Sequence, residues 1–357
     1  MPRVIGIDPG TVSIDICGLD DGRVFLDESL PTSEALRDAT AFGARLQAAG
    51  PIDLIVGPSG YGLPCIRASD VSDADLRLAV LAAEGESGGI GGLRTLIRAH
   101  GRSGLPVVLT PGVIHLASVP AHRKANRIDM GTADKVCAVA LAVREQSERR
   151  RCAIDQTALI LLELGGAFTA AIAVEDGRIV DGVGGSSGPL GLRAAGALDG
   201  EVAFLAGRVS KSMIFTGGAA TIAGDARLDP AGSPRHRVAW DAYIEAAVKA
   251  VAGLRVSAPA AREVILSGRM ANVREVRDEV VRQLRRVDDA FRVEVLTGFA
   301  ASAAHAAHGA ALVADGLAGG ANADLVQTLG IADAAGTALD HLYVMTPAQA
   351  KRTLGIE

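Results

Sequence analysis

Aromatic residues and cysteines are scarce in this chain. Phe, Trp and Tyr together make up 3% of the 357 residues, which argues against an aromatic-lined binding surface. The four cysteines are Cys17, Cys65, Cys137 and Cys152, and no two of them form a C-x-x-C pair. That spacing argues against disulfides, an iron–sulfur cluster and a structural zinc ion. We therefore expect reduced cysteines, most of them in the core.

The chain also lacks a surplus of positive charge and a long apolar run. Its net charge is -5, so it has no overall basic character of the kind that binds a phosphate backbone, and nucleic acid is not an expected partner. No apolar stretch reaches the roughly 18 to 20 residues that a membrane span needs, and no signal segment opens the chain. We expect a cytoplasmic protein without a membrane partner.

The chain is long and rich in apolar and small residues. Hydrophobic residues make up 49% of the sequence, and Gly occupies 43 positions. A chain of 357 residues exceeds what one core usually serves, so either two domains or one elaborated domain is expected. Abundant small residues favour helices packed closely against sheets, which indicates a globular α/β protein.

The same order of elements occurs twice, about half a chain apart. Residues 4–22 predict a strand, a Pro-Gly-Thr turn, a second strand and an Asp-Asp-Gly turn. Residues 158–181 repeat this order, with Gly165-Gly166 as the first turn and Asp176-Gly177 in the second. Such an internal repeat indicates two related structural units.

Hydrophobic periodicity predicts further elements outside the two repeats. Short apolar runs predict strands at residues 52–56, 107–109, 263–266 and 291–296. Helical spacing predicts helices at residues 73–83, 132–145, 240–254, 272–286 and 300–314. Gly-rich or Pro-rich composition predicts loops at residues 184–191 and 224–234.

The two repeated turns are candidate phosphate-binding sites, because successive backbone N–H groups beside Gly and hydroxyl residues bind anions. The first turn offers Gly10, Thr11 and Ser13, and the second offers Gly165, Gly166 and Thr169. A single turn of this kind is more often an ordinary hairpin. Its recurrence favours two turns that grip one polyphosphate from both sides.

A carboxylate ends the predicted buried strand before each turn, Asp8 in the first repeat and Glu163 in the second. An unpaired charge at such a place costs free energy unless a cation or hydrogen-bond donors meet it. One interpretation is Mg²⁺, held directly or through water, because this ion bridges carboxylate and phosphate oxygens. The alternative is that each carboxylate accepts local backbone hydrogen bonds.

Polar residues are concentrated in residues 122–135. Asp129 and Asp134 are candidate general bases for a substrate hydroxyl. The start of the helix predicted here is a candidate site for a substrate anion, since its N–H groups and dipole favour negative charge. Candidate substrate-binding residues are Arg67, Asn126, Arg127 and Lys135. The simpler alternative is that Thr132 or Asp129 caps the helix and that Asp134 and Lys135 form a solvated pair.

These motifs resemble those of the acetate and sugar kinase, Hsp70 and actin superfamily. The two turns are similar to its phosphate 1 and phosphate 2 motifs. REVILSGRMANVREV resembles its adenosine motif, with Gly268 at the usual glycine and Arg269 in place of a second one. The resemblance implies two ribonuclease-H-like (actin-like ATPase) domains with ATP and Mg²⁺ in a cleft between them. The implied domains are residues 1–150 with residues 300–357 packed back on them, and residues 151–299.

Within that superfamily the chain is similar to butyrate kinase and is identified as a member of the DUF1464 family of predicted butyrate kinases. The likeness rests on VGPSGYGLP and on the order of LGGAFTAAIAVEDGRIVDG and SGPLGLRAAGAL. Arg193 in the last segment matches a catalytic arginine, which would stabilise charge on a transferring phosphoryl group. The resemblance implies an ATP-dependent phosphotransferase with a small carboxylate or hydroxyl acceptor, and a homodimer at the family level.

The chain also departs from acetate and butyrate kinases. Asp8 and Glu163 stand where those enzymes have Asn and His, and residues 297–308 contain no carboxylate where those enzymes place a Glu. The acid pair is instead that of Hsp70, actin and sugar kinases, which also fits hydroxyl phosphorylation or ATP hydrolysis. An ATP-binding regulator or assembly protein of the same fold is an open alternative. An acyl- or carbamoyl-transferring enzyme is less favoured, because His305 and His308 have no third metal ligand nearby.

Overall fold

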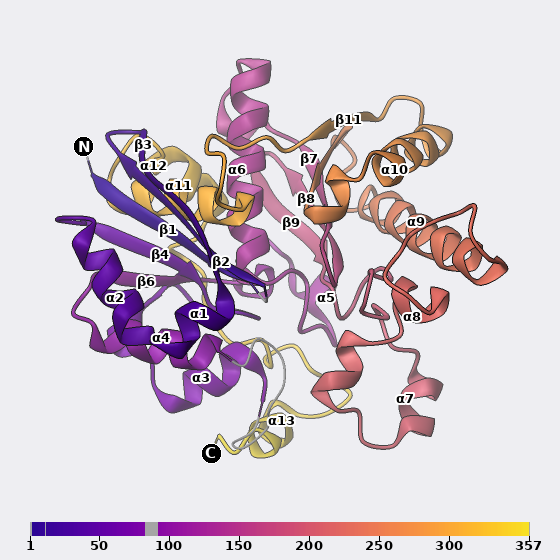
Figure 1. The fold of residues 1–357 in the computed structure, drawn as a ribbon, viewed down its shortest axis with the longest axis horizontal. Helices are drawn as coiled ribbons and strands as arrows, with labels where there is room; N and C mark the ends of the chain where they lie inside the picture. Colours follow the sequence, from indigo (N-terminus) through magenta and orange to yellow (C-terminus); the bar gives the residue numbers. More distant parts are fainter. Residues whose placement is uncertain (1, 11, 83–91, 357) are drawn as a thin grey trace. The chain divides into compact units, whose positions relative to one another are not determined.

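Figure 1 shows the computed structural model, which describes residues 2–10, 12–82 and 92–356. The chain forms two compact units. The first comprises Met1–Ile128, Thr132–Thr157 and Thr297–Glu357, and the second comprises Asp129–Gly131 and Ala158–Leu296. Each unit has one β-sheet with helices packed on it, which confirms the predicted α/β class.

The sheet of the first unit has the strand order β3-β2-β1-β4-β6-β5. The strands are β1 (Arg3–Pro9), β2 (Ser13–Asp20), β3 (Arg23–Pro31), β4 (Leu54–Pro58), β5 (Ile66–Arg67) and β6 (Val107–Thr110). β1 to β3 form an antiparallel meander, whereas β4 runs parallel to β1 and β6 parallel to β4. Most apolar residues of β1, β2, β4 and β6 are buried, as expected for strands with both faces covered, whereas β3 carries the exposed Val24.

The sheet of the second unit repeats this topology in the order β9-β8-β7-β10-β11. The strands are β7 (Leu159–Leu164), β8 (Thr169–Glu175), β9 (Arg178–Val183), β10 (Glu263–Ser267) and β11 (Arg292–Val295). Again three antiparallel strands are followed by two parallel additions. The internal repeat predicted from the sequence is thus a repeat of topology.

The first unit has nine helices among its described residues, and one of them, α11 (His305–Leu317), makes two close approaches. The helices are α1 (Thr32–Arg37), α2 (Ala39–Ala48), α3 (Asp73–Val80), α4 (Leu93–Arg102), α5 (Ala121–Lys124), α6 (Ala133–Arg150), α11, α12 (Ala323–Leu329) and α13 (Pro347–Thr353). α11 lies against β1, β2, β4 and α6. A Cβ atom at Gly6 would lie 2.2 Å from the Ala311 nitrogen, and one at Gly309 would lie 1.8 Å from the Cys137 carbonyl. Glycine therefore lets α11 contact both β1 and α6.

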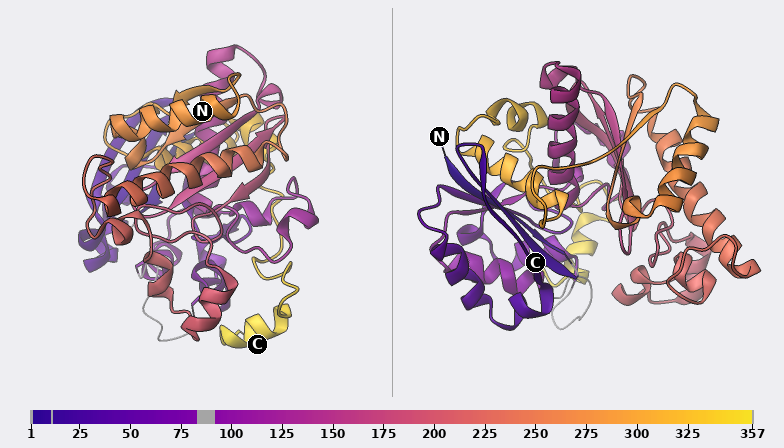
Figure 2. Two further views of the ribbon diagram at one scale, coloured as in Figure 1. Left: turned by 90° about the vertical axis from the view of Figure 1, so that its right-hand side faces the viewer. Right: turned by 45° about the horizontal axis from the view of Figure 1, so that its top comes forward.

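In the second unit α9 (Pro234–Leu254) and α10 (Arg274–Val287) lie alongside each other over one face of the sheet, as both views of Figure 2 show. The shorter α7 (Gly200–Ala206) and α8 (Ala219–Ala223) precede them. Trp240 and Tyr243 on α9 belong to the core of this unit. None of the helices among the described residues combines the length and apolar character needed to cross a membrane.

One predicted helix is shorter than expected. The Ala-rich helix predicted from residue 300 begins only at His305. The amides of Ala301, Ser302 and Ala303 instead donate to the Asp27 carboxylate, so these residues form a loop held by a side chain far away in sequence. The hydrophobic pattern of residues 300–314 gives no sign of this contact with Asp27.

Candidate functional site

The first repeated turn is a tight connection between β1 and β2. The Gly10 N–H donates to the Asp8 carbonyl over 3.1 Å, and the Thr32 hydroxyl donates to the Gly10 carbonyl over 2.8 Å. A Cβ atom at Gly10 would lie 2.8 Å from the Ser13 carbonyl oxygen, too close for a side chain without movement. Thr11, predicted to contact phosphate, lies outside the described residues.

Two carboxylates lie opposite each other across this hairpin. Asp8 on β1 is the direct partner of Asp15 on β2, so both side chains point to one face of the sheet. Asp15 is 4% exposed and accepts a hydrogen bond from the Ser13 hydroxyl over 2.8 Å. The predicted nucleotide contact of Ser13 stays a prediction. Sequence analysis missed Asp15, although it stands as far after the turn as Asp8 stands before it.

Asp134 lies at the start of α6 and forms an ion pair with Lys135. Burial alone would raise the pKa of Asp134, but the charge of Lys135 and hydrogen bonds from Lys135 and Thr132 outweigh it and lower that pKa. The carboxylate is therefore ionised at neutral pH. The Ala133 N–H donates to the Gly60 carbonyl, so the first amide of the helix is already satisfied.

The Asp134 carboxylate lies in the first turn of this helix, where negative charge is favourable, and the substrate anion expected there stays a prediction. Burial raises the pKa of the Cys137 thiol to about 12, and the charges of Asp134 and Asp8 add to that rise. Both carboxylates therefore lie near Cys137. The structure brings two of the predicted catalytic residues of the first unit, Asp8 and Asp134, into one neighbourhood.

Two other predicted substrate residues of the first unit have different surroundings. The side-chain oxygen of Asn126 accepts hydrogen bonds from the amides of Tyr343 and Val344, at 2.7 and 2.9 Å, so it anchors the C-terminal segment. Arg67 is exposed on the edge strand β5. Substrate contacts by Arg67, Asn126 and Arg127 stay predictions.

The second repeated turn has the same close approach as the first. The Gly165 N–H donates to the Phe168 carbonyl over 2.9 Å, and a Cβ atom at Gly165 would lie 2.6 Å from that carbonyl oxygen. Gly166 is exposed at the tip, and Glu163 is the next-to-last residue of β7, before the turn. Thr169 is fully buried on β8, next to Tyr243 of α9, and its nucleotide contact stays a prediction.

Gly268 joins the adenosine-like segment to this turn. It follows β10 with φ +86°, a conformation that favours glycine. A Cβ atom there would lie 2.6 Å from the Leu164 carbonyl oxygen and 3.1 Å from Cγ of Glu163. The structure therefore brings together Gly268, Glu163 and the start of the Gly165-Gly166 turn.

Arg193 also lies beside this turn. Its N–H and that of Ala194 donate to the Ala167 carbonyl, over 3.0 and 3.1 Å. Its side chain is exposed, and no bond of its guanidinium group is found among the described residues. Only the backbone of Arg193 is therefore anchored at the turn. Asp129, the other predicted base, is 6% exposed and accepts from Ser186 and Gly131.

The loop of residues 297–304 is held by two carboxylates that sequence analysis did not find. Glu145 of α6 accepts from the amides of Thr297 and Gly298, and Asp27 of β3 accepts from three amides of residues 301–303. Although burial opposes it, these amide bonds lower the pKa of Asp27. No group of three or more His, Cys, Asp or Glu side chains suited to a metal occurs in the part of the chain that the structure describes.

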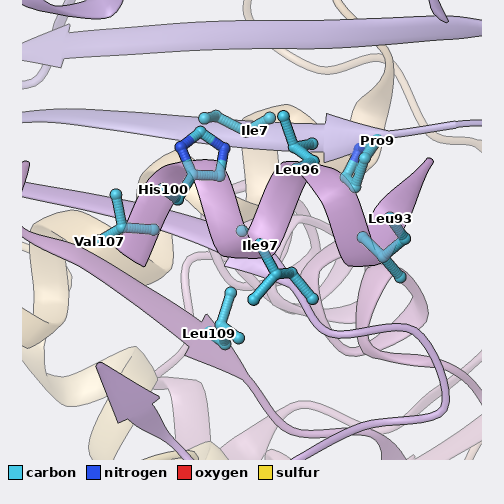
Figure 3. A pocket seen from close by; sticks show the side chains of 9 residues that line it. Ile7, Pro9, Leu93, Leu96, Ile97, His100, Val107 and Leu109 are labelled. Carbon is cyan, nitrogen blue, oxygen red and sulfur yellow. The ribbon is translucent and has the colours of Figure 1, made fainter. Parts of the chain in front are cut away.

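A small apolar pocket lies in the core of the first unit, lined by side chains of β1, α4 and β6 (Figure 3). Its volume is about 10 Å³, room for about one water molecule. His100 lines it, and burial lowers the pKa of this histidine to about 4. The pocket is a packing gap and not a substrate site.

Comparison with known proteins identifies a family for this chain. The family model described as "Protein of unknown function (DUF1464)" matches residues 6–344. A search of curated proteins found no match.

Solved structures with the same fold include two acetate kinases and a propionate kinase. The acetate kinase from Entamoeba histolytica has a TM-score of 0.58 and 11% identity, over 80% of this chain and 87% of that one. The propionate kinase from Francisella tularensis has a TM-score of 0.62 and 13% identity, over 87% and 98%. The Porphyromonas gingivalis acetate kinase has a TM-score of 0.58 and 14% identity, over 87% and 98%. At such identities the similarity shows the fold alone, which this chain shares with these acetate and propionate kinases.

Proposed function

Because this chain belongs to the DUF1464 family and has the fold of the acetate kinases, we propose that it is an ATP-dependent phosphotransferase with a small carboxylate or hydroxyl acceptor. One observation supports this most directly. Each unit has the same hairpin, with an acid at the end of the first strand and a glycine in the turn. In our proposal the backbone N–H groups of these turns bind the phosphates of ATP.

The other predicted residues take roles around those turns. Gly268 permits close approach of the adenosine part, because no Cβ atom fits beside Leu164. Arg193 stabilises charge on the transferring phosphoryl group, a task suited to its planar and permanently charged guanidinium. Asp134 would orient the acceptor hydroxyl by accepting its hydrogen bond, because its lowered pKa makes it a weak general base.

Asp8 and Glu163 are each a ligand type that suits Mg²⁺. This ion commonly takes one or two carboxylates, keeps several waters and completes its shell with substrate phosphates. Asp8 and Glu163 are carboxylates at strand ends, each directly before a phosphate-binding candidate. When bound, Mg²⁺ would neutralise charge on the nucleotide phosphates.

The regulatory alternative is favoured by one feature, the loop of residues 297–304. It has no carboxylate of its own, and Glu145 and Asp27 are engaged in holding its backbone. A nucleotide switch without phosphoryl transfer would need no acid there. Cytoplasmic localisation and a homodimer stay predictions.

The proposal is tested by thermal stability with ATP, ADP and AMP-PNP, with and without Mg²⁺. We expect a Mg²⁺-dependent stabilisation that Asp8→Asn and Glu163→Gln both abolish. Glu175→Gln is the matched control, since Glu175 ends β8 and bonds the Ala260 amide. Absence of any nucleotide effect on the wild type would exclude the kinase function.

A positive result leads to an acceptor screen. ADP release is measured with short-chain carboxylates, butyrate among them, and with polyols of similar size. ADP release that depends on an acceptor supports the phosphotransferase. Nucleotide-dependent changes in shape or association, without acceptor-dependent release, would favour the regulator.

A further inference from the structure

The surroundings of Asp129 suggest a role different from that of a base. One carboxylate oxygen accepts from the Ser186 N–H over 2.9 Å and from the Ser186 hydroxyl over 2.8 Å. The other accepts from the Gly131 N–H over 3.2 Å. The side chain is 6% exposed. Its lone pairs are thus turned toward fixed donors of the protein and not toward solvent.

The backbone of Asp129 holds the same loop. Its carbonyl accepts from the Gly184 N–H over 3.1 Å and from the Ser187 hydroxyl. A Cβ atom at Gly184 would lie 1.7 Å from a carboxylate oxygen of Asp129, so only glycine allows this packing. Side chain and backbone of Asp129 together anchor residues 184–187.

The other end of this segment lies on the second glycine turn. A Cβ atom at Gly191 would lie 2.4 Å from the Ala167 carbonyl oxygen, and the amides of Arg193 and Ala194 donate to that same oxygen. Gly185 also packs closely against Phe168, since a Cβ atom at Gly185 would lie 2.5 Å from the Phe168 side chain. Residues 184–194 therefore connect Asp129 with the turn that follows Glu163.

We infer that Asp129 is a positioning residue: it fixes the segment of residues 184–194 and thereby holds Arg193 beside the Gly165-Gly166 turn. This inference rests on the proposed function, in which Arg193 acts on the transferring phosphoryl group. It replaces the role of general base that the sequence suggested for Asp129. It also explains the glycine at position 184 and the serine at position 186.

The first test is hydrogen–deuterium exchange of the amides of residues 191–194, without nucleotide. Asp129→Asn and the milder Ser186→Ala should both speed their exchange, because each removes a bond that anchors the segment. Ser257→Ala is the matched control, since it removes a serine–carboxylate bond to Asp181 elsewhere in the same unit. Unchanged exchange in Asp129→Asn would overturn the inference.

The second test is the rate of ADP formation from Mg·ATP, with water or the best acceptor of the screen. Asp129→Asn and Arg193→Ala should each lower kcat about tenfold or more, and the double variant should be no slower than Arg193→Ala alone. Any fall of kcat at low pH in the wild-type enzyme should remain in Asp129→Asn. Loss of that fall, or a double variant in which the two single losses of kcat multiply, would mean that Asp129 acts on the reacting atoms.

Different results would contradict the proposed function and the positioning role of Asp129. A wild-type protein that binds no nucleotide contradicts the proposed function, while the exchange measurement still decides whether Asp129 holds residues 184–194. A wild-type enzyme with normal exchange in Asp129→Asn contradicts the positioning role alone.

Discussion

The β1–β2 and β7–β8 hairpins have the same backbone. Asp8 pairs with Asp15 in the first, and Glu163 pairs with Ala170 in the second, each position following its counterpart by 155 residues. The pairing with the third strand shifts at Gly18/Leu19 and at the corresponding Ala173/Val174. Both units also end the hairpin's second strand in an Asp-Gly turn with positive φ at both residues.

The side chains opposite the two acids differ. Asp8 faces a second carboxylate, which has the Ser13 hydroxyl as a donor, whereas Glu163 faces Ala170. Like charges directly opposite each other are destabilising unless a donor or cation meets them. Backbone geometry is thus common to both units, while the charge at the turn is concentrated in the first.

The largest effect is expected from a variant that gives the second hairpin an acid pair like that of the first. Ala170→Asp should lower the free energy of unfolding by about 3 kcal/mol or more, because the new charge is buried opposite Glu163 without a serine donor. The measurement is urea unfolding followed by fluorescence of Trp240, the only tryptophan, which lies in the second unit.

Ala170→Asn is the control for that variant, since it has the same shape without the charge. The difference between the two variants isolates the electrostatic part. Equal stability of the Asp and Asn variants would show that the second hairpin accommodates an acid pair as well as the first.

A second difference concerns histidine. Burial lowers the pKa of His100 to about 4, below the 6.5 of an unfolded histidine, so the unfolded chain binds more protons between these values. Stability should therefore fall as pH drops from 6.5 to 4. For His100 the loss between pH 7 and pH 5 is about 2 kcal/mol.

His100→Leu should remove that part of the pH dependence, because leucine suits the apolar lining formed with Ile7 and Leu96 (Figure 3). Urea unfolding at pH 7 and pH 5, followed by circular dichroism, measures it. His236 is the only histidine of the second unit. An equal slope in His100→Leu and wild type would contradict the assignment.

A third prediction concerns the glycine that both hairpins have at the same position of the turn. Gly10→Ala and Gly165→Ala place a Cβ atom 2.8 and 2.6 Å from a carbonyl oxygen in equivalent positions. Both should weaken Mg·ATP binding about tenfold or more, measured by titration calorimetry, because the turn must deform. Gly22→Asn, at the far end of the first hairpin where no atom lies within 4 Å, should bind as the wild type. Loss in only one turn would show that the turns are not equivalent.

Much of the fold was predictable from local patterns. The strands around Asp8 and Glu163 and their glycine turns follow from apolar runs and turn residues, and they agree with β1, β2, β7 and β8. Of the candidate site, Gly10, Gly165 and Gly268 have backbone surroundings that require glycine. The burial of Thr169 against Tyr243 was not predicted, and its nucleotide contact stays a prediction.

The rest could not be predicted because it depends on contacts between residues far apart in sequence. The bond between Asp129 and Ser186, and those of Asp27 with residues 301–303, arise only after strands and helices have packed. The sequence by itself determined the repeated hairpins, since turn residues and apolar runs act locally. Only the tertiary structure decided which carboxylates remain near the glycine turns and which are taken up in holding loops, because packing sets which donors each carboxylate meets.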